Sequence, residues 1–410
     1  MRPRVRSFPL ALAAIVGAGF ALRVVYTVWL APRTSGLFDA FYFRIVGLSV
    51  AEGHGFVSPY EFLSEGGPST PTADHPPLYP LVLALEHELG VTGDTLQRST
   101  GALLGAATVA LIGLLGRRVG GERTGLIAAG IAAVYPLLIV TDGALLSETL
   151  YAPLVAASML FAYSVIDRPG VAAASMLGAA IGLAALTRSE ALLLLLLLAL
   201  PAAYRGGTRW AARFAVCGLA TAVVVAPWIV RNWIVFDRPL MSNNEGALIA
   251  QTNCDDAYHG PRLGYLGVHC LGPASGDEAD KAAHWRRKGL DYAGDHLERV
   301  PVVVAVRVLR EWALYDFGHA VRDSEGRNHD VQRIGIVMSF LMLPLAVAGA
   351  VLLRRRREPL VPLLAPLALA VLVAAATYGS IRLRIAGEIP LVVLAAAALS
   401  HGLEGRRRAA

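Results

Sequence analysis

Charged residues are scarce in this chain. Asp, Glu, Lys and Arg make up 17% of the 410 residues, and 55% of the residues are hydrophobic. A soluble domain usually has about 25% charged residues. The apolar residues come in long uncharged runs, most of them long enough to cross a bilayer. This scarcity of charge excludes an ordinary soluble globular protein and predicts an all-α, polytopic membrane protein whose spans contact the lipid bilayer.

A basic surface for nucleic acid is also lacking, although the formal net charge is +6. The arginines are grouped at the ends of apolar runs, at 2–6, 117–123, 205–213, 354–357 and 406–408. Arginines in such positions are typical of cytoplasmic loops of membrane proteins. We therefore expect no nucleic-acid partner.

The apolar runs predict about ten spans. The first run, from Phe8 to Leu30, is too long for the apolar part of a signal peptide, so we expect it to be retained as a span. Starting inside and crossing at each span places every arginine cluster on the cytoplasmic side. The spans are expected at about 8–30, 98–116, 121–140, 145–166, 171–187, 190–204, 211–230, 332–353, 359–378 and 385–402.

Three segments do not fit a simple span. The segment 76–90 would form a helix of about 22 Å, which is shorter than the ~30 Å hydrocarbon core, so it is interpreted as interfacial or re-entrant. The run 171–204 is too long for one helix and must turn at Arg188 and Glu190, below the membrane surface and facing protein or a watery cavity. Segment 301–318 is interrupted by Arg307, Arg310 and Glu311 and is expected to form an amphipathic surface helix.

This topology leaves two extracytoplasmic regions. We divide the chain into an N-terminal transmembrane core (1–230) that contains the first outer loop (about 31–97), an extracytoplasmic loop region (231–331) and C-terminal transmembrane helices (332–410). The predicted location is the inner cell membrane, with several crossings and an active site on the extracytoplasmic side. No internal repeat is visible in the sequence.

Cysteine is rare, with three residues in the whole chain. Cys217 lies in a predicted span and is expected to be packed there. Cys254 and Cys270 share the second outer region, where a disulfide closing about 17 residues would contribute about 3 kcal/mol. Zinc binding by these two cysteines with His259 and His269 is the alternative, but the spacing does not match a standard zinc pattern.

The first outer region carries the main candidate for chemistry. Asp39 lies just beyond the first span, at the start of apolar positions that recur at helical spacing from Leu37 to Val50. A helix-terminal Asp that accepts bonds from free backbone N–H groups explains Asp39 equally well. His75 precedes two prolines in "TADHPPLYP", which place it at the membrane boundary. An ordinary turn with an exposed His is the competing explanation.

Further charged residues are predicted on the same outer side. Glu148 opens a span, Arg188 and Glu190 occupy the sunken turn, and Arg231 follows Trp228 at a membrane boundary, where interface anchoring would also explain it. Arg382 and Arg384 are outer cations against the positive-inside trend, which a lipid phosphate would explain. Glu388 follows Arg384 at a spacing that allows an ion pair.

Carboxylates and cations on one face suggest a specific chemistry. A lipid-phosphate sugar donor needs cations for its leaving phosphate, and an acceptor hydroxyl needs a base. General-base catalysis would contribute about 10²–10⁴-fold, and neutralisation of the phosphate and orientation of the substrates would supply the rest.

Six motifs in this order resemble a known class. They are "FDAFYFRIVGLSVAEGHGF", "HPPLYPLVLAL", "SETLY", "LTRSEALLLLLLLAL", "PWIVRNWIVFDRPLMSNNEGALI" and "RLRIAGEIPLVVLAA". Over most of its length the chain is similar to GT-C glycosyltransferases that use polyprenyl-phosphate sugars. It resembles in particular the bacterial relatives of protein O-mannosyltransferases and of lipid A aminoarabinose transferases, a glycosyltransferase family 39-like group.

The resemblance implies an inverting transfer of a sugar, such as arabinose or mannose, from a polyprenyl phosphate to a cell-envelope glycan, lipid or protein. It implies that Asp39 is the base, that Glu148 shapes the site and that His75 lies near the donor phosphate, where many relatives have Arg or Lys. A lone Asp in the first loop leaves metal use open, so no cofactor is assigned and a divalent metal stays possible. A transporter or flippase of lipid-linked saccharides is the alternative function.

The candidate residues fall into three sets. The catalytic candidate is Asp39. The candidates for binding the donor phosphate are His75, Arg188, Arg231, Arg382 and Arg384. The candidates for substrate binding are Tyr42, Asp74, Tyr79, Glu148, Glu190, Asn243, Asn244 and Glu388.

Overall fold

The computed structural model describes residues 8–32, 39–64, 70–267, 269–323 and 325–409, and for 404–409 it describes the backbone only. Two of the arginine clusters used for the topology, 2–6 and the side chains of 406–408, lie outside this description. So does Leu37, the first position of the predicted surface helix.

The described chain is helical, and its only β pairing is an isolated bridge between Val57 and Pro71. The helices are α1 (Phe8–Val25), η1 (Tyr26–Leu30), α2 (Asp39–Ala51), α3 (Pro59–Phe62), α4 (Leu78–Glu88), α5 (Asp94–Gly120), α6 (Glu122–Val134), α7 (Pro136–Asp142), α8 (Glu148–Asp167), α9 (Val171–Ala185), η2 (Ser189–Leu193), η3 (Leu195–Ala199), α10 (Leu200–Arg205), α11 (Trp210–Phe236), α12 (Asn244–Thr252), α13 (Asp255–Tyr258), η4 (Gly260–Arg262), α14 (Glu278–Asp295), α15 (Val300–Glu311), α16 (Phe317–Arg322), α17 (His329–Arg355), α18 (Val361–Ala376) and α19 (Ile385–Ala409).

All ten predicted spans are helical, but they differ in length. Within the described residues, six helices are long and apolar enough to cross a membrane, or seven if α6 and α7 count as one span bent by 57°. The helices α9 and α18 are apolar but shorter, and 189–205 is divided among η2, η3 and α10. By length and composition, six or seven of these segments are long enough to cross a membrane, and α9, α18 and the broken run 189–205 are the shorter ones. The described helices confirm an all-α polytopic membrane protein.

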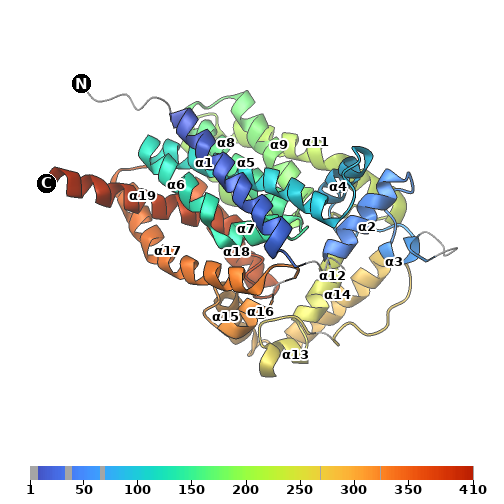
Figure 1. Cartoon of the computed structure of the whole chain (residues 1–410). Coiled ribbons are helices and arrows are strands. Elements are labelled where there is room, and N and C mark those ends of the chain that lie inside the picture. Colours follow the sequence, from blue (N-terminus) through green and yellow to red (C-terminus); the bar gives the residue numbers. More distant parts are fainter. Residues whose placement is uncertain (1–7, 33–38, 65–69, 268, 324, 410) are drawn as a thin grey trace.

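The most buried helix is α19, which packs against α5, α6, α8, α17 and α18 (Figure 1). Its residues from Ile389 to Ala397 are buried without exception. A helix that is apolar on all sides belongs at the centre of a bundle. The loop that precedes α19 is therefore held at the middle of the molecule's outer end.

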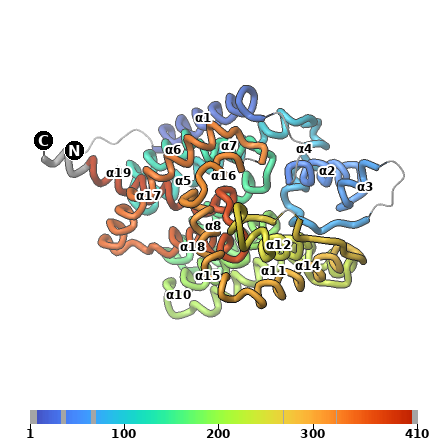
Figure 2. Tube along the Cα trace, turned by 90° about the horizontal axis from the view of Figure 1, so that it is seen from below, coloured from blue at the N-terminus to red at the C-terminus, as the bar shows by residue number. Residues whose placement is uncertain are grey.

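The predicted cytoplasmic loops meet at one end of the bundle. Arg118, in the last turn of α5, pairs with Asp167, the last residue of α8, at 2.5 Å and with Glu358 after α17 at 3.2 Å. The start of α1 also lies at this end, whereas α2, α3, α12 and α14 lie at the opposite end in both views (Figure 1, Figure 2). The contacts agree with the predicted alternation of loops between two sides.

One charged residue inside the first span has a partner within the bundle. Arg23 is buried, and its Nε lies 2.6 Å from Oδ2 of Asp142 at the end of α7. It also donates to the carbonyls of Gly19, Ala132 and Ala133. An isolated charge at this depth is costly, so the pair explains how α1 tolerates an arginine.

The second outer region is fastened to the first. A disulfide joins Cys254 and Cys270, as predicted, and Cys217 is a buried free cysteine. The backbone N–H of Asn243 donates to Ala73 O at 2.8 Å, and that of Asn244 donates to Asp74 O at 3.2 Å. The loop that leads into α4 is therefore held from both sides.

The predicted amphipathic helix at 301–318 forms as α15, but its charges face inward. Arg307, Arg310 and Glu311 are buried, whereas Val302 and Leu309 are exposed. Arg307 and Arg310 donate to backbone carbonyls of the second outer region and α18, which cover this side of the helix. The charged side of the helix therefore faces the protein together with Val303 and Val306, and the remaining apolar residues are partly or fully exposed.

Candidate functional site

The end of the bundle opposite the Arg118 ion pairs gathers three carboxylates around one guanidinium. Nη2 of Arg382 lies 2.6 Å from Oδ2 of Asp39, the first residue of α2. The same side chain pairs with Glu148, the first residue of α8, and with Glu325, in the loop before α17. Arg382 itself, between α18 and α19, is only 6% exposed. Residues far apart in sequence thus form one compact ionic centre.

A second arginine extends this centre. Nη1 of Arg188 lies 2.6 Å from Oε1 of Glu148, and its Nε lies 2.5 Å from Oε1 of Glu190. Arg188 and Glu190, which the sequence placed together in a turn, therefore form an ion pair where α9 gives way to η2. Glu148 bridges both arginines. We call the six residues the Arg382 cluster: Asp39, Glu148, Arg188, Glu190, Glu325 and Arg382.

The cluster contains four carboxylates and two guanidinium groups, so acidic charge exceeds basic charge by two. Asp39 is 25% exposed at its side chain, whereas Glu148 is almost completely buried. Asp39 is thus the acid of the Asp39–Arg382–Glu148 series that an external molecule reaches most easily. A base that contacts both the inner arginine and the outside is suited to remove a proton from a bound substrate.

His75 lies between Asp39 and a further carboxylate. Its Nε2 is 3.5 Å from Oδ1 of Asp39 and 3.4 Å from Oδ2 of Asp74. The rings of Tyr42 and Phe43 pack against it with centroids 4.8 and 5.0 Å away. The backbone N–H of Leu78 donates to Leu186 O at 2.8 Å, which fastens the loop to the end of α9. The two prolines after His75 keep this approach extended.

These contacts shift the acid–base properties of the loop residues. Burial would raise the pKa of Asp39, but Arg382 and His75 outweigh it and hold the pKa well below its usual range. Burial would lower the pKa of His75, but Asp39 and Asp74 raise it above the ordinary value. Burial, with help from Glu278 and against His75, raises the pKa of Asp74 to about 6. Asp39 is thus ionised at neutral pH, Asp74 takes up a proton near pH 6, and His75 keeps its charge to higher pH than a free histidine.

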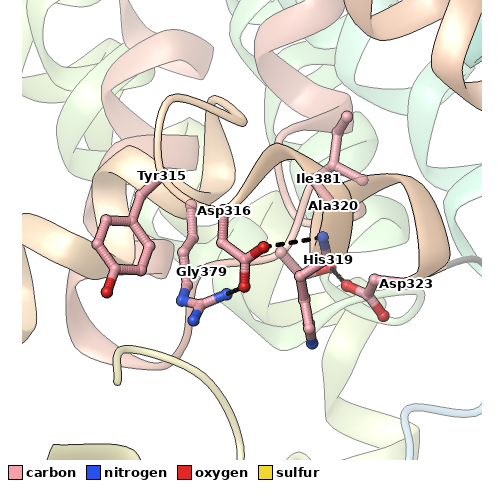
Figure 3. Close-up of a pocket in the computed structure, with 9 residues that line it drawn as sticks. Tyr315, Asp316, His319, Ala320, Asp323, Gly379 and Ile381 are labelled. Atoms are coloured by element: carbon pink, nitrogen blue, oxygen red, sulfur yellow. Dashed lines mark hydrogen bonds and ion pairs between the residues drawn. The ribbon is translucent and has the colours of Figure 1, made fainter. Parts of the chain in front are cut away.

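A shallow recess adjoins the cluster on the side of α15 and α16 (Figure 3). Arg310 Nη1 lies 3.6 Å from Asp316 Oδ2, and the backbone N–H of His319 donates to Asp316 Oδ1 at 3.1 Å. Ser380 Oγ donates to Asp323 Oδ2 at 2.7 Å and accepts from the backbone N–H of Arg382 at 3.3 Å. This recess borders the loop that carries Arg382.

Several predicted residues lie outside the Arg382 cluster. Arg231 donates to the carbonyls of Thr72 at 2.9 Å and Phe56 at 3.0 Å, and these bonds hold the loop before His75. Arg384 is fully buried, lies over the Trp312 ring and pairs with Glu388 at 2.5 Å, as the spacing predicted. The phosphate-binding roles of these two arginines stay predictions, and the described contacts give each a structural partner.

The predicted substrate-binding residues divide in the same way. Tyr42 contacts the His75 ring, and its hydroxyl accepts from the His75 backbone N–H at 3.4 Å. Tyr79 is buried against Phe43. Asn243 donates from Nδ2 to Glu278 at 2.9 Å and, like Asn244, binds the backbone of the 73–74 loop. These residues support the His75 loop, and their contact with a substrate stays a prediction.

Sequence reasoning missed Glu325 and Asp323. They lie in the polar stretch "RDSEGRNHD", just before the outer end of α17. Their position at a predicted membrane boundary was the available signal. The local pattern does not indicate which acid of a polar stretch faces an arginine some sixty residues later.

The sequence left the use of a divalent metal open. The described part of the chain has no group of three or more His, Cys, Asp and Glu arranged to hold a metal ion. Asp39, Glu148 and Glu325 all direct oxygens at Arg382. The alternative zinc site in the second outer region is wrong, because Cys254 and Cys270 form a disulfide.

The fold is similar to that of solved membrane proteins. The chain superposes on the oligosaccharyltransferase AglB of Archaeoglobus fulgidus, solved with an inhibitory peptide and a dolichol-phosphate, with a TM-score of 0.52, 15% identity and coverage of 98% of this chain and 52% of that chain. The chain thus spans about half the length of that neighbour. ArnT of Cupriavidus metallidurans, bound to undecaprenyl phosphate, gives a TM-score of 0.45 at 16% identity, covering 97% of this chain and 78% of that chain.

A comparison of the sequence with protein families gives one match, over part of the chain. Residues 74–231 match the family described as dolichyl-phosphate-mannose-protein mannosyltransferase, and this stretch includes Asp74, His75, Glu148, Arg188 and Glu190. No characterised protein sequence matches the chain. The resemblance to GT-C glycosyltransferases predicted from the sequence is confirmed by the family match and by the fold.

Proposed function

We propose that this protein is a membrane glycosyltransferase that moves a sugar from a polyprenyl-phosphate donor to an acceptor in the cell envelope. The active site is the Arg382 cluster together with His75, on the extracytoplasmic side. The transfer inverts the configuration at the anomeric carbon, and Asp39 is the general base.

The observation that carries this proposal is the convergence of Asp39, Glu148 and Glu325 on Arg382. The convergence lies at the end of the bundle that is opposite to the Arg118 ion pairs. A partly exposed carboxylate beside a buried guanidinium combines a base with a cation for a leaving phosphate. The family match to dolichyl-phosphate-mannose-protein mannosyltransferases over 74–231 supports the choice of donor.

In the proposed reaction, an oxygen lone pair of the acceptor hydroxyl attacks the anomeric carbon from the face opposite the phosphate. The bond between that carbon and the phosphate oxygen breaks, and its electron pair leaves with the phosphate. The hydroxyl proton goes to Asp39. Arg382, Arg188 and His75 lie where they can neutralise the departing phosphate, and no general acid is needed because phosphate is a good leaving group.

The low pKa of Asp39 has a mechanistic consequence. With Arg382 and His75 both directed at it, Asp39 is a weak base. A donor phosphate that draws Arg382 or His75 towards itself weakens those pairs and thereby raises the basicity of Asp39. The base becomes effective only when the donor is bound, which limits the use of water as an acceptor.

The proposal is tested by incubating purified protein with a panel of polyprenyl-phosphate sugars and envelope acceptors. Replacing Asp39 by Asn keeps its shape and should lower transfer by about 10²–10⁴-fold, because the general base is removed. Asp280→Asn, at the exposed pair with Arg238 on the second outer region, is the matched control.

Normal transfer by folded Asp39→Asn protein would contradict its role as the base. Movement of lipid-linked saccharides across reconstituted vesicles, without any sugar transfer, would instead identify a flippase.

A further inference from the structure

All three guanidinium nitrogens of Arg382 face carboxylates. Nε and Nη2 donate to the two oxygens of Glu148, Nη2 also lies 2.6 Å from Oδ2 of Asp39, and Nη1 donates to Oε2 of Glu325. The arginine side chain is only 6% exposed, which leaves little room for a further ligand beside these acids. A phosphate that pairs with Arg382, as the proposed function requires, therefore has to take the place of one carboxylate.

The three carboxylates are not held equally. Asp39 has His75 as a second partner, whose Nε2 lies 3.5 Å away. Glu148 has Arg188 as a second partner, whose Nη1 lies 2.6 Å away. Within the residues that the structure describes, Glu325 forms an ion pair with this one guanidinium and with no other cation. Glu325 is therefore the carboxylate that an arriving phosphate displaces most easily.

Glu325 lies in a short turn between α16 and α17, where the backbone is strained. Its φ is +40°, and φ of Gly326 is +83°. Residues other than glycine seldom adopt a positive φ, and they keep it where surrounding contacts hold them. The contact with Arg382 is one of these contacts. The Glu325 side chain is 18% exposed, so it can turn towards solvent when that contact is lost, and the turn can then relax.

The charges around Glu325 point in the same direction. Burial raises the pKa of Glu325 above its ordinary value, and the neighbouring charges of Asp39 and Asp323 add to this effect. The positive charges of Arg382 and Arg327 lower that pKa but do not outweigh the burial. By contrast, the pKa of Asp39 is held well below its usual range. Of the two acids, Glu325 is thus the one whose negative charge is disfavoured, and an arriving phosphate would add to the repulsion.

We propose that Glu325 occupies the phosphate position at Arg382 in the empty site and exchanges with the donor phosphate when the donor binds. This inference rests on the proposed function. When the sugar has been transferred, Glu325 returns to Nη1 of Arg382 and displaces the polyprenyl phosphate product. Glu148 keeps the guanidinium in place during the exchange. Glu325 acts through Arg382 and is a positioning residue, which sets how tightly the phosphate is held and how fast it leaves.

The test measures binding of undecaprenyl phosphate, which carries no sugar, to the purified full chain in detergent micelles. Binding needs no catalysis, and transfer from a sugar donor is measured in parallel. Glu325→Gln is isosteric and removes the carboxylate charge. Asp323→Asn is the control, because it removes a charge from the same segment, where the carboxylate accepts from Tyr265 and Ser380 and not from the Arg382 guanidinium.

Glu325→Gln should bind undecaprenyl phosphate about tenfold more tightly than the wild type, because the ligand no longer competes with a charge-assisted bond. Its KM for the donor should fall, and inhibition of transfer by undecaprenyl phosphate should become stronger by a similar factor. Asp323→Asn should show no such gain. A role of Glu325 in holding the turn alone would give equal or weaker binding, and that result would overturn the proposal.

Two further outcomes separate the possible causes. Equal tightening in Asp323→Asn would assign the gain to overall charge and would also overturn the exchange. If neither the wild type nor Glu325→Gln binds undecaprenyl phosphate, the donor class of the proposed function fails as well, whereas equal binding by both overturns the exchange alone.

A measurement on the wild type decides the matter if Glu325→Gln does not fold. Hydrogen–deuterium exchange of the backbone amides in 325–328 should become faster when undecaprenyl phosphate is added, because the turn loses its contact with Arg382. Unchanged or slower exchange in this segment, with the ligand bound, would overturn the proposal.

Discussion

Arg382 is the side chain on which the outer ends of three helical segments depend. It pairs with Asp39, Glu148 and Glu325, and Glu148 in turn pairs with Arg188. Buried carboxylates without a cation would be strongly destabilised. Arg382 therefore has two tasks in our proposal: it holds the acids in place before the donor binds, and it faces the phosphate afterwards.

At the same scale, His75 should give donor binding a pH dependence. The raised pKa of His75 means that its positive charge persists to higher pH than in a free histidine and is lost as the pH rises through that value. The KM for the donor should therefore rise at alkaline pH, by about tenfold if one charge-assisted bond is lost. His75→Lys keeps its charge to about pH 10 and should abolish this rise.

Asp74 provides the control for this prediction. Its carboxylate raises the pKa of His75, so Asp74→Asn should move the rise in KM to lower pH. Below pH 6, the wild-type Asp74 itself takes up a proton, because its pKa is about 6, and the two proteins should then converge. Donor KM values measured across this range check both statements, and an unchanged pH dependence in His75→Lys would contradict them.

At the scale of elements, the breaks in the helices place the charged residues. The bend of 57° between α6 and α7 lies at Tyr135 and Pro136, and Tyr135 donates its hydroxyl proton to Glu388 at 2.7 Å. The turn from α9 into η2 brings Arg188 to Glu148. A continuous helix in either place would move Tyr135 away from Glu388, or Arg188 away from Glu148. Prolines and polar turns therefore interrupt the helices at the points where charged side chains meet inside the bundle.

The inward face of α15 gives a prediction on stability. Glu311 is fully buried, and burial raises its pKa to about 8 in spite of nearby Arg384. The folded protein therefore keeps a proton on Glu311 at neutral pH that the unfolded chain releases. The stabilisation is complete below the unfolded pKa, near pH 4.5, and declines by about 1.4 kcal/mol per pH unit until the pH passes the folded value.

Replacing Glu311 by Gln should remove this decline. Thermal unfolding in detergent from about pH 5 to about pH 8 should show a steeper loss of stability in the wild type than in Glu311→Gln. Glu298→Gln, at an exposed position shortly before α15, serves as the control and should follow the wild type. Parallel curves for Glu311→Gln and the wild type would show that the carboxylate is already ionised in the fold.

At the scale of the whole molecule, two groups of ion pairs mark the two ends. Arg118 pairs with Asp167 and Glu358 at one end, where α8 finishes, and the Arg382 cluster lies at the other end, where α8 begins with Glu148. By the positive-inside rule, we predict that the first end faces the cytoplasm. The Arg382 cluster then faces the opposite side, where lipid-linked sugars and envelope acceptors would be used.

Single cysteines test this orientation. Arg238→Cys, on the second outer region, should react with a membrane-impermeant maleimide in intact cells. Arg209→Cys, in the turn before α11, should react only after the membrane is permeabilised. Cys217 is buried, and Cys254 and Cys270 are joined, so the native cysteines contribute little background. The reverse pattern of labelling would invert the topology and place the Arg382 cluster inside.

The sequence predicted the helical segments of the bundle, favoured the Cys254–Cys270 disulfide over zinc binding, and marked the acids and bases near the predicted outer ends. These follow from local patterns, because apolar runs, arginine clusters and turns act over short stretches of chain. The pairing of Arg188 with Glu190 and of Arg384 with Glu388 was equally local.

Which of these charged residues form ion pairs with one another depends on the packing of elements that are far apart in the sequence. Arg382 and Arg384 are two residues apart, yet one pairs with Asp39 and Glu148 and the other is sealed against Trp312 and Glu388. Glu325 joins the site although no motif marks it. Arg382 and Arg384 point to different sides of the loop before α19. The packing of α8, α15 and α17 around that loop determines the partner of each arginine.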